Sequence, residues 1–277
     1  MSLQKYSVLM SVYAKEKPEF LRESMMSMYE QTVPTDDFVL ICDGPLNEGI
    51  DSVIDEMSRL FGGRLRVFRF SENRGLGYAL GFGVEKCKNE LIARMDSDDV
   101  SVRDRCEKEL RAFEREPNLS VVGSYVAEFK DDIEKMNSIR KVPEKNKEIL
   151  VFAKMRNPIN HPSAMMKKKD VLTVGGYKNV KFCQDYYLWT DLLANGYRCY
   201  NIQEVLVYMR EDANTFKRRS GKKYFKIQKD LISKMRKQGL LTIPQYYKTV
   251  SVRFCSAFMP NWCRQSLFKK FMREGVK

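Results

Sequence analysis

The stretch LIARMDSDD (residues 91–99) joins a short apolar run to a cluster of acidic residues. The run 91–95 predicts a buried strand, and the three carboxylates that follow it would repel each other and lose solvation. A divalent cation such as Mg²⁺ or Mn²⁺, held by these oxygen ligands, would relieve the repulsion. The alternative is that the acids begin the next helix, with Asp98 or Ser101 as its cap. At the carboxyl end of a strand, the cation is the favoured interpretation.

Strand and helix patterns alternate around this stretch. The predicted strands are residues 6–11, 37–42, 65–70, 91–95 and 121–129, and the predicted helices are residues 18–30, 50–60, 75–87 and 103–116, the last a charged surface helix. Such repeated β-α-β units predict an α/β fold with a mainly parallel central sheet flanked by helices. Ligands bind at the carboxyl ends of the strands in these sheets, where Ser11, Asp43 and the acidic cluster lie.

The alternation becomes less regular after Pro143. The pattern there predicts helices at 145–155 and 185–194, strands at 163–166, 198–202 and 205–209, and a rigid loop at 157–162. Since neither a repeat nor a flexible linker interrupts the chain, residues 1–215 are expected to form one domain. Residues 216–277 are expected to form a basic, amphipathic helical extension.

Composition and charge narrow the possible partners. The chain of 277 residues is 43% hydrophobic and 31% charged, which suits a folded protein and excludes a disordered one. Its net charge of +13 is concentrated near the C-terminus, because residues 210–277 contain 18 basic and 4 acidic side chains. Nucleic acids, anionic lipids and acidic ligands all suit such a segment. No helix-turn-helix, zinc or RNA-binding motif is visible, so we expect no nucleic-acid partner.

Aromatic and basic side chains are interleaved in the C-terminal segment. The apolar residues before Pro260 that share one helical face are Ile243, Tyr246, Tyr247, Val250, Phe254 and Phe258, and those after it are Trp262, Leu267, Phe268, Phe271 and Met272. This composition suits a helix in the headgroup layer of an anionic membrane, and the alternative is packing on the domain. We expect a mixture of both.

Localisation is predicted from two further features. Seven scattered cysteines without metal-binding spacing are typical of a reducing compartment. The N-terminus lacks the pattern of a secretory signal, and no apolar run is long enough to span a bilayer. We therefore expect a cytoplasmic protein that lies peripherally on the inner face of the cell membrane.

Six short motifs follow one another along the chain. They are Ser11-Val12-Tyr13; Cys42-Asp43-Gly44; Asn73-Arg74-Gly75-Leu76-Gly77; Met95-Asp96-Ser97-Asp98-Asp99; Asn160-His161-Pro162-Ser163 with Val174-Gly175-Gly176-Tyr177; and Gln184-Asp185-Tyr186-Tyr187-Leu188-Trp189. In this order they resemble family 2 glycosyltransferases with the GT-A nucleotide-sugar-binding fold, closest to bacterial exopolysaccharide and amylovoran-type enzymes. The resemblance covers about residues 5–210 and implies a nucleotide-sugar half at about 1–130 and an acceptor half at about 131–215.

The resemblance implies a reaction and its donor residues. The reaction is the inverting transfer of a sugar from a UDP-sugar to a hydroxyl of a saccharide acceptor, expected to be lipid-linked, in bacterial surface polysaccharide synthesis. The implied donor residues are Ser11 and Asp43 for the nucleoside, Arg74 near the diphosphate, Asp96 for ribose or metal, and Asp98 with Asp99 for Mn²⁺ or Mg²⁺. Arg210 would close over the diphosphate, and a solvated surface arginine is its alternative.

The resemblance also implies acceptor-side residues. Asp185 would be the general base that takes the proton of the acceptor hydroxyl, and a helix N-terminal acid is its alternative. The family usually has Glu before this Asp, whereas this chain has Gln184, which replaces a charged contact by a neutral one. His161, Gln184 and Trp189 are candidates for the acceptor side or its loop, with a structural role as the alternative for His161.

Three other functions compete with the transferase. A nucleotidyltransferase of the same fold would need a Gly-rich basic loop directly after the first strand, and residues 11–14 do not form one. A protein that binds nucleic acid or an anionic surface through its basic tail is the second. The third is a catalytically silent homologue, for which Gln184 is the only indication.

Overall fold

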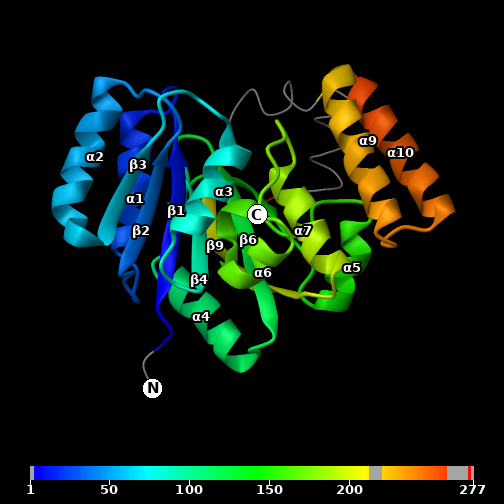
Figure 1. Cartoon of the computed structure of the whole chain (residues 1–277), viewed down its shortest axis with the longest axis horizontal. Coiled ribbons are helices and arrows are strands. Elements are labelled where there is room, and N and C mark those ends of the chain that lie inside the picture. Colours follow the sequence, from blue (N-terminus) through cyan, green and yellow to red (C-terminus); the bar gives the residue numbers. More distant parts are fainter. Residues whose placement is uncertain (1–2, 212–219, 261–273, 276–277) are drawn as a thin grey trace.

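The computed structural model describes residues 3–211, 220–260 and 274–275. A ten-stranded sheet in the order β10-β7-β6-β8-β4-β1-β2-β3, with β9 beside β6 and β5, runs through the molecule between helices (Figure 1). The strands are β1 (Tyr6–Val12), β2 (Asp37–Cys42), β3 (Leu65–Arg69), β4 (Leu91–Asp96), β5 (Val100–Ser101), β6 (Leu119–Phe129), β7 (Met136–Arg140), β8 (Met165–Lys167), β9 (Arg198–Arg210) and β10 (Glu274–Gly275). The predicted α/β class is confirmed.

Helices cover the sheet and continue beyond it. The α-helices are α1 (Pro18–Tyr29), α2 (Glu48–Phe61), α3 (Leu76–Lys86), α4 (Arg105–Arg115), α5 (Asn146–Ala153), α6 (Lys168–Thr173), α7 (Gln184–Ala194), α9 (Gly221–Lys237) and α10 (Ile243–Phe258). Two short 3₁₀ helices are η1 (Gly62–Arg64) and η2 (His161–Ser163).

Four parallel strands, β3-β2-β1-β4, form the half of the sheet that the sequence predicts best. Both faces of this half are covered, because alternate β1 residues enter two separate cores. Val8 and Met10 pack in the core under α1, α2 and α4, whereas Leu9 packs in the core under α3 and α7. Continuous apolar runs such as 37–42 follow from this burial on two faces.

The second half of the sheet differs from the predicted pattern. The two strands expected at 198–202 and 205–209 are one strand, β9, which pairs in parallel with β6 through several register shifts. The strand expected at 163–166 starts with η2, so that β8 begins only at Met165. β8 is antiparallel to both β4 and β6 and joins the two halves. The short elements α6 and β7 have no clear sequence signal.

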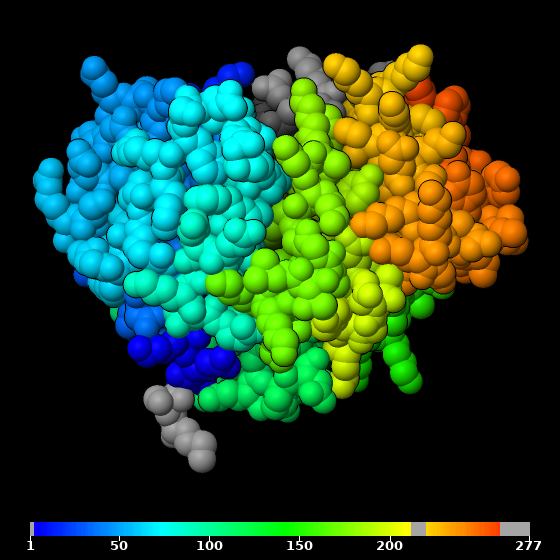
Figure 2. All heavy atoms as spheres, viewed as in Figure 1, coloured from blue at the N-terminus to red at the C-terminus, as the bar shows by residue number. Residues whose placement is uncertain are grey.

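The two C-terminal helices α9 and α10 pack against each other, and together we call them the hairpin. They lie beside α7 and α5, on the opposite side of the molecule from α2 (Figure 1). Figure 2 shows their side chains abutting those of the α7 region. Leu231, Ile232 and Met235 of α9 share a small core with Tyr186 and Tyr187 of α7. The predicted boundary between 215 and 216 lies outside the described residues.

The predicted aromatic face of residues 243–258 divides into two strips. Tyr246 and Val250 pack partly against the small core of the hairpin. By contrast, Tyr247 is 64% exposed, and Phe254 and Phe258 are about half exposed at 51% and 50%. The second apolar set, from Trp262 to Met272, lies outside the described residues. Within residues 3–211 and 220–260, none of the helices is long and apolar enough to span a bilayer.

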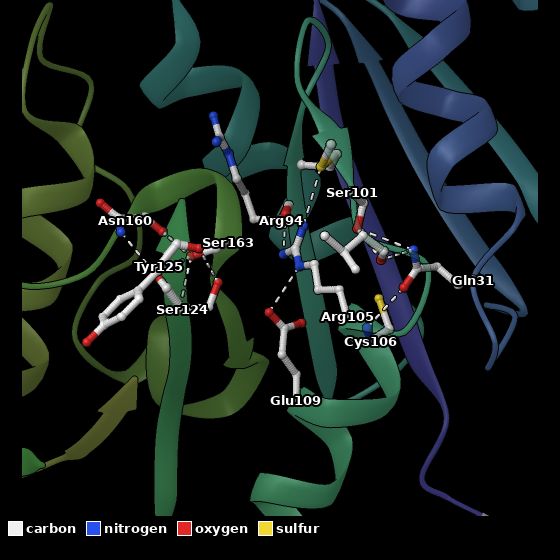
Figure 3. A network of polar contacts seen from close by, with 12 residues as sticks. Gln31, Arg94, Ser101, Arg105, Cys106, Glu109, Ser124, Tyr125, Asn160 and Ser163 are labelled. Atoms are coloured by element: carbon white, nitrogen blue, oxygen red, sulfur yellow. Dashed lines mark hydrogen bonds and ion pairs between the residues drawn. The ribbon is translucent and has the colours of Figure 1, made fainter. Parts of the chain in front are cut away.

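The expectation of a charged surface helix at 103–116 is partly wrong, because α4 buries an ion pair. Arg105 and Glu109 are fully buried, and Arg105 Nε donates to Glu109 Oε1 at 3.0 Å. Arg105 Nη2 also donates to the Arg94 carbonyl oxygen at 2.8 Å (Figure 3). This one guanidinium therefore ties α4 to the strand that ends in the acidic cluster.

Replacing Arg105 by Met is expected to destabilise the protein by about 3–5 kcal/mol, because it leaves Glu109 buried without its partner. Urea unfolding at pH 8 measures this loss, because the Glu109 carboxyl of the wild type, whose pKa burial raises to about 7, is ionised and paired there. The double variant Arg105→Met/Glu109→Leu should lose less. The control Arg111→Met removes the exposed pair with Glu107 and should cost under about 1 kcal/mol. Equal losses in Arg105→Met and Arg111→Met would contradict the assignment.

Candidate active site

Three strand ends meet at the carboxyl edge of the parallel half. Ser11 of β1 pairs in register with Asp96 of β4, and Val12 pairs with Cys42 of β2. Asp43 follows β2 directly, and its backbone N–H donates to the Val12 carbonyl at 2.8 Å. The parallel register therefore brings Ser11, Asp43 and Asp96 to one edge, as the sequence predicts.

The acidic cluster forms a compact group of oxygens. One carboxylate oxygen from each of Asp96, Asp98 and Asp99 lies within 4.8 Å of the others. Burial, followed by the charges of Asp96 and Glu16, raises the pKa of Asp98 to about 7. Burial and its acidic neighbours raise the pKa of Asp99 well above its ordinary value. The structure thus carries the charge repulsion that the sequence predicts.

The cluster fits a divalent cation. Asp99 Oδ2 is buried without a hydrogen-bond partner, so one oxygen of the cluster is available as a ligand. Three adjacent carboxylates are the hard oxygen donors that Mg²⁺ and Mn²⁺ prefer. The alternative of a helix cap is wrong, because α4 starts after Asp104, well beyond Asp98 and Ser101.

Arg94 is a site residue that the sequence reasoning missed. It is 1% exposed, and its guanidinium makes a two-point ion pair with the carboxylate of Asp96. The charge of Asp96 is therefore offset inside the protein, whereas within residues 3–211 and 220–260 neither Asp98 nor Asp99 has an ion pair of this kind. An arginine in the middle of the buried run 91–95 was the available signal, because buried charges require partners.

Arg210 is held in place around the acidic turn. Its backbone N–H donates to Asp99 Oδ1 at 2.9 Å, and its Nε donates to the Asp98 carbonyl at 3.1 Å. The guanidinium pairs with Glu23 of α1 and lies over the Phe20 and Phe129 rings, 3.9 and 4.4 Å from their centroids. The alternative of a solvated surface arginine is wrong, since the side chain is only 9% exposed.

Asp43 organises the start of α3. Its two carboxylate oxygens accept hydrogen bonds from the backbone N–H groups of Arg74 and Gly75, at 2.7 and 3.0 Å. Gly44 has a φ of +94°, and a Cβ there would meet the Asn73 nitrogen at 2.7 Å, so this turn requires glycine. Asp43 therefore has a structural role in this turn. Arg74 is exposed, and its guanidinium lies over the Tyr78 ring at 3.6 Å.

Asp185 lies in the first turn of α7, where the sequence places it. Asn157, from the segment after α5, donates a side-chain hydrogen bond to Asp185 Oδ2. Gln184 packs against α3, since a Cβ on Gly77 would lie 3.1 Å from Gln184 Cγ. Helix α3, whose start Asp43 holds, therefore packs against the first residue of α7, the helix that carries Asp185.

His161 and Trp189 lie behind the site. His161 Nε2 shares a hydrogen bond with the Tyr177 hydroxyl at 2.9 Å, and burial together with Arg94 lowers the histidine pKa well below its ordinary value. His161 is therefore neutral near pH 7, which agrees with the structural alternative. Trp189 is fully buried, its ring centroid 6.1 Å from that of His161. It cannot contact an acceptor in this conformation, and that expectation is corrected.

Tyr177 connects the two halves of the site. Burial raises the pKa of its hydroxyl, Arg94 opposes the rise, and both Asp185 and Asp96 add to it. Carboxylates from α7 and from the end of β4 thus act on one buried hydroxyl. Asp185 and Asp96, which are distant in the sequence, are therefore both close enough to Tyr177 to influence its pKa.

Comparisons with known proteins agree with this geometry. The family model described as "Glycosyl transferase family 2" matches residues 7–174. An Escherichia coli UDP-Gal:alpha-D-GlcNAc-diphosphoundecaprenol beta-1,3-galactosyltransferase is 36% identical over 276 residues, covering 98% of this chain and 97% of its own. The amylovoran biosynthesis glycosyltransferase AmsE of Erwinia amylovora is 32% identical over 268 residues, covering 96% and 98%.

Solved structures share the fold at low sequence identity. TarS 1-349 of S. aureus in complex with UDP-GlcNAc superposes with a TM-score of 0.65 at 15% identity, over 96% of this chain and 76% of that one. The mannosyltransferase PcManGT of Pyrobaculum calidifontis, in complex with GDP-Man and Mn²⁺, gives a TM-score of 0.66 at 14% identity, over 96% and 73%. The predicted GT-A fold is confirmed.

Replacing Asp99 by Asn is expected to raise the melting temperature in chelator, because it removes a buried charge while Oδ1 still accepts the Arg210 amide. The same variant should lose most of the melting-temperature increase that Mn²⁺ gives the wild type. Differential scanning fluorimetry with and without Mn²⁺ measures both effects. The exposed control Asp131→Asn should behave like the wild type. An undiminished Mn²⁺ response in Asp99→Asn would remove Asp99 from the ligand set.

Proposed function

The chain belongs to glycosyl transferase family 2, and on that premise we propose that this glycosyltransferase moves a sugar from a UDP-sugar to a saccharide acceptor with inversion. The E. coli relative, whose name states UDP-Gal and a diphosphoundecaprenol-linked acceptor, covers almost the whole chain. The amylovoran relative supports a place in bacterial surface polysaccharide synthesis. The acceptor of this chain is accordingly proposed to be lipid-linked.

The donor lies at the carboxyl edge of the parallel strands. Asp98 and Asp99, with Asp96 beside them, would hold Mn²⁺ or Mg²⁺, which offsets the charge of the diphosphate leaving group when bound. Arg94 fixes the Asp96 carboxylate, so the cluster keeps its shape as the donor arrives. Ser11, Asp43 and Arg74 are proposed on the nucleoside and diphosphate side, near the start of α3.

The acceptor hydroxyl is activated by Asp185. A carboxylate within hydrogen-bond reach takes the hydroxyl proton as the oxygen attacks the anomeric carbon. The Asn157 amide orients this carboxylate, and Gln184 beside it supplies only neutral contacts. Attack from the face opposite the diphosphate inverts the anomeric centre.

One observation carries the proposal: Asp185 begins α7, and α7 packs through Gln184 on α3, whose start is held by Asp43 at the carboxyl edge of the parallel strands. An inverting transferase needs a base and a charge-stabilising group on opposite sides of one sugar. An aspartate whose only role was to stabilise the N-terminus of α7 would not need a place beside the proposed donor side of the site.

Replacing Asp185 by Asn is expected to lower kcat for transfer by about 10²–10⁴-fold, because the base is lost while the side-chain shape is kept. Binding of UDP in the presence of Mn²⁺, measured by calorimetry, should stay within a factor of two or three. Turnover of a panel of UDP-sugars, including UDP-galactose and UDP-N-acetylglucosamine, is measured with and without chelator.

The exposed control Asp55→Asn on α2 should transfer like the wild type. Wild-type turnover in Asp185→Asn would remove the base assignment, and wild-type turnover in chelator would remove the metal.

The hairpin is proposed to hold the enzyme on the anionic, cytoplasmic face of the membrane. Tyr247, Phe254 and Phe258 present half-exposed rings, and Phe225 of α9 packs against the last two. Lysines such as Lys226 and Lys229 of α9 supply positive charge. Rings and basic side chains together suit an interfacial surface, which a lipid-linked acceptor would require.

The variant Tyr247→Ser/Phe254→Ser of the full chain is expected to lose most of its flotation with vesicles containing anionic lipid, since it removes exposed ring area from α10. The wild type should float with these vesicles and not with neutral ones. The control Leu60→Ser removes an exposed apolar residue of α2, on the far side of the molecule, and should float normally. Recovery of both variants and the wild type in the soluble fraction would contradict membrane docking.

A further inference from the structure

Asp185 is supported from two separate segments of the chain. On one side, Cys183 directly precedes α7. Its φ is +65°, and it is the one non-glycine among the described residues with a positive φ. On the other side, Asn157 donates its hydrogen bond to Asp185 from the segment after α5. A left-handed cysteine is strained and persists only where its surroundings hold it. Both segments are held by contacts from the hairpin.

Helix α9 holds the first segment. Gln228 is 3% exposed, and its Nε2 donates to Cys183 Sγ at 2.9 Å. Tyr224, one turn earlier on α9, packs its ring against Phe182 with 5.7 Å between centroids. The strained residue that starts α7 is thus fixed by a side-chain contact from the hairpin.

Helix α10 holds the second segment. Arg253 Nη2 donates to the Met155 carbonyl at 2.5 Å, and Thr249 Oγ1 donates to the Lys154 carbonyl at 3.3 Å. Arg253 is also close enough to Tyr186 of α7 to oppose the rise that burial causes in the pKa of its hydroxyl, and this hydroxyl donates to the Ala153 carbonyl at 2.6 Å. The end of α5, the approach to Asn157 and the first turn of α7 therefore share one guanidinium.

The hairpin is also anchored to α7 further along the helix. Lys234 forms an ion pair with the buried Asp191 at 2.5 Å, and Gln238 donates to the same carboxylate at 2.7 Å. The Tyr187 hydroxyl donates to the Ile227 carbonyl at 3.3 Å. These contacts fix α9 along α7 and keep Gln228 next to Cys183. Helix α10, which packs on α9, places Arg253 next to the Met155 carbonyl.

We propose that the hairpin braces the acceptor side of the site, with Gln228 and Arg253 as positioning residues for Asp185. This inference rests on the proposed role of Asp185 as the base. Neither side chain touches substrate; they hold the two segments from which Asp185 and Asn157 extend. Proton transfer requires heavy atoms within about 2.6–3.2 Å, and misplacement by about 1 Å can reduce a rate by about 10²-fold.

The first test is hydrogen exchange followed by mass spectrometry on full-length Arg253→Ala and Gln228→Ala. Peptides covering 153–158 in the first variant and 182–186 in the second are expected to exchange at least several-fold faster than in the wild type. Peptides covering the Asp43 turn should be unchanged in both. The matched control Lys248→Ala removes an exposed charge from α10 and should leave every peptide unchanged.

The second test separates positioning from general stability. Hydrolysis of UDP-galactose by Arg253→Ala is expected to show kcat lowered about 10-fold or more with KM for the donor unchanged, and Arg253→Lys should recover part of the loss. If Arg253→Ala fails to fold, Thr249→Val takes its place in both measurements, with a smaller expected effect. A fall in kcat matched by Lys248→Ala, or a rise in donor KM of equal size, would overturn the proposal.

The brace and the role of Asp185 as the base are tested by separate results. Unchanged exchange at 153–158 and 182–186 would overturn the brace whatever chemistry Asp185 performs. Full activity in Asp185→Asn would overturn the base, while faster exchange in Arg253→Ala would still show that the hairpin supports these segments. Faster exchange together with unchanged kcat would overturn the positioning role.

Discussion

The proposed donor side of the site depends on holding three carboxylates together at the end of one strand. The fold does this with arginines that lie inside the protein. Arg94 pairs with Asp96, Arg105 fixes the strand through the Arg94 carbonyl, and Arg210 bonds the turn at Asp98 and Asp99. They come from β4, α4 and the end of β9, so the acidic turn is the point at which distant segments meet. If these arginines had only a structural role in the sheet, well-packed apolar residues in their place would often give equal or greater stability.

The parallel half of the sheet was predictable because its signals are local. Apolar runs, turn residues and acids that follow a strand fix which side chains reach the carboxyl edge, so Ser11, Asp43 and Asp96 could be placed together. The acidic character of the turn can also be read directly from the sequence of residues 96–99. The second half was less predictable, because the register shifts of β9 and the short β8 depend on contacts between distant residues.

The supports of the site were not predictable, although their residues are visible in the sequence. Arg105 and Glu109 look like surface charges because helical spacing alone does not show which face α4 buries. Trp189 belongs to the same family motif as Asp185, but α7 turns that position into the core. The contact of Gln228 with Cys183 joins residues 45 positions apart and has no pattern in the sequence.

The two halves of the site are therefore stabilised in different ways. The proposed donor side is held by charges buried among the strands. The segments that carry Asp185 and Asn157 contact the hairpin, whose outer surface carries the exposed ring of Tyr247 and the half-exposed ring of Phe254. The same helix, α10, thus presents an apolar surface outward and directs Arg253 inward to the segment of Asn157. A partner on the outer face of α10 would therefore contact the same helix that holds the segment before Asn157.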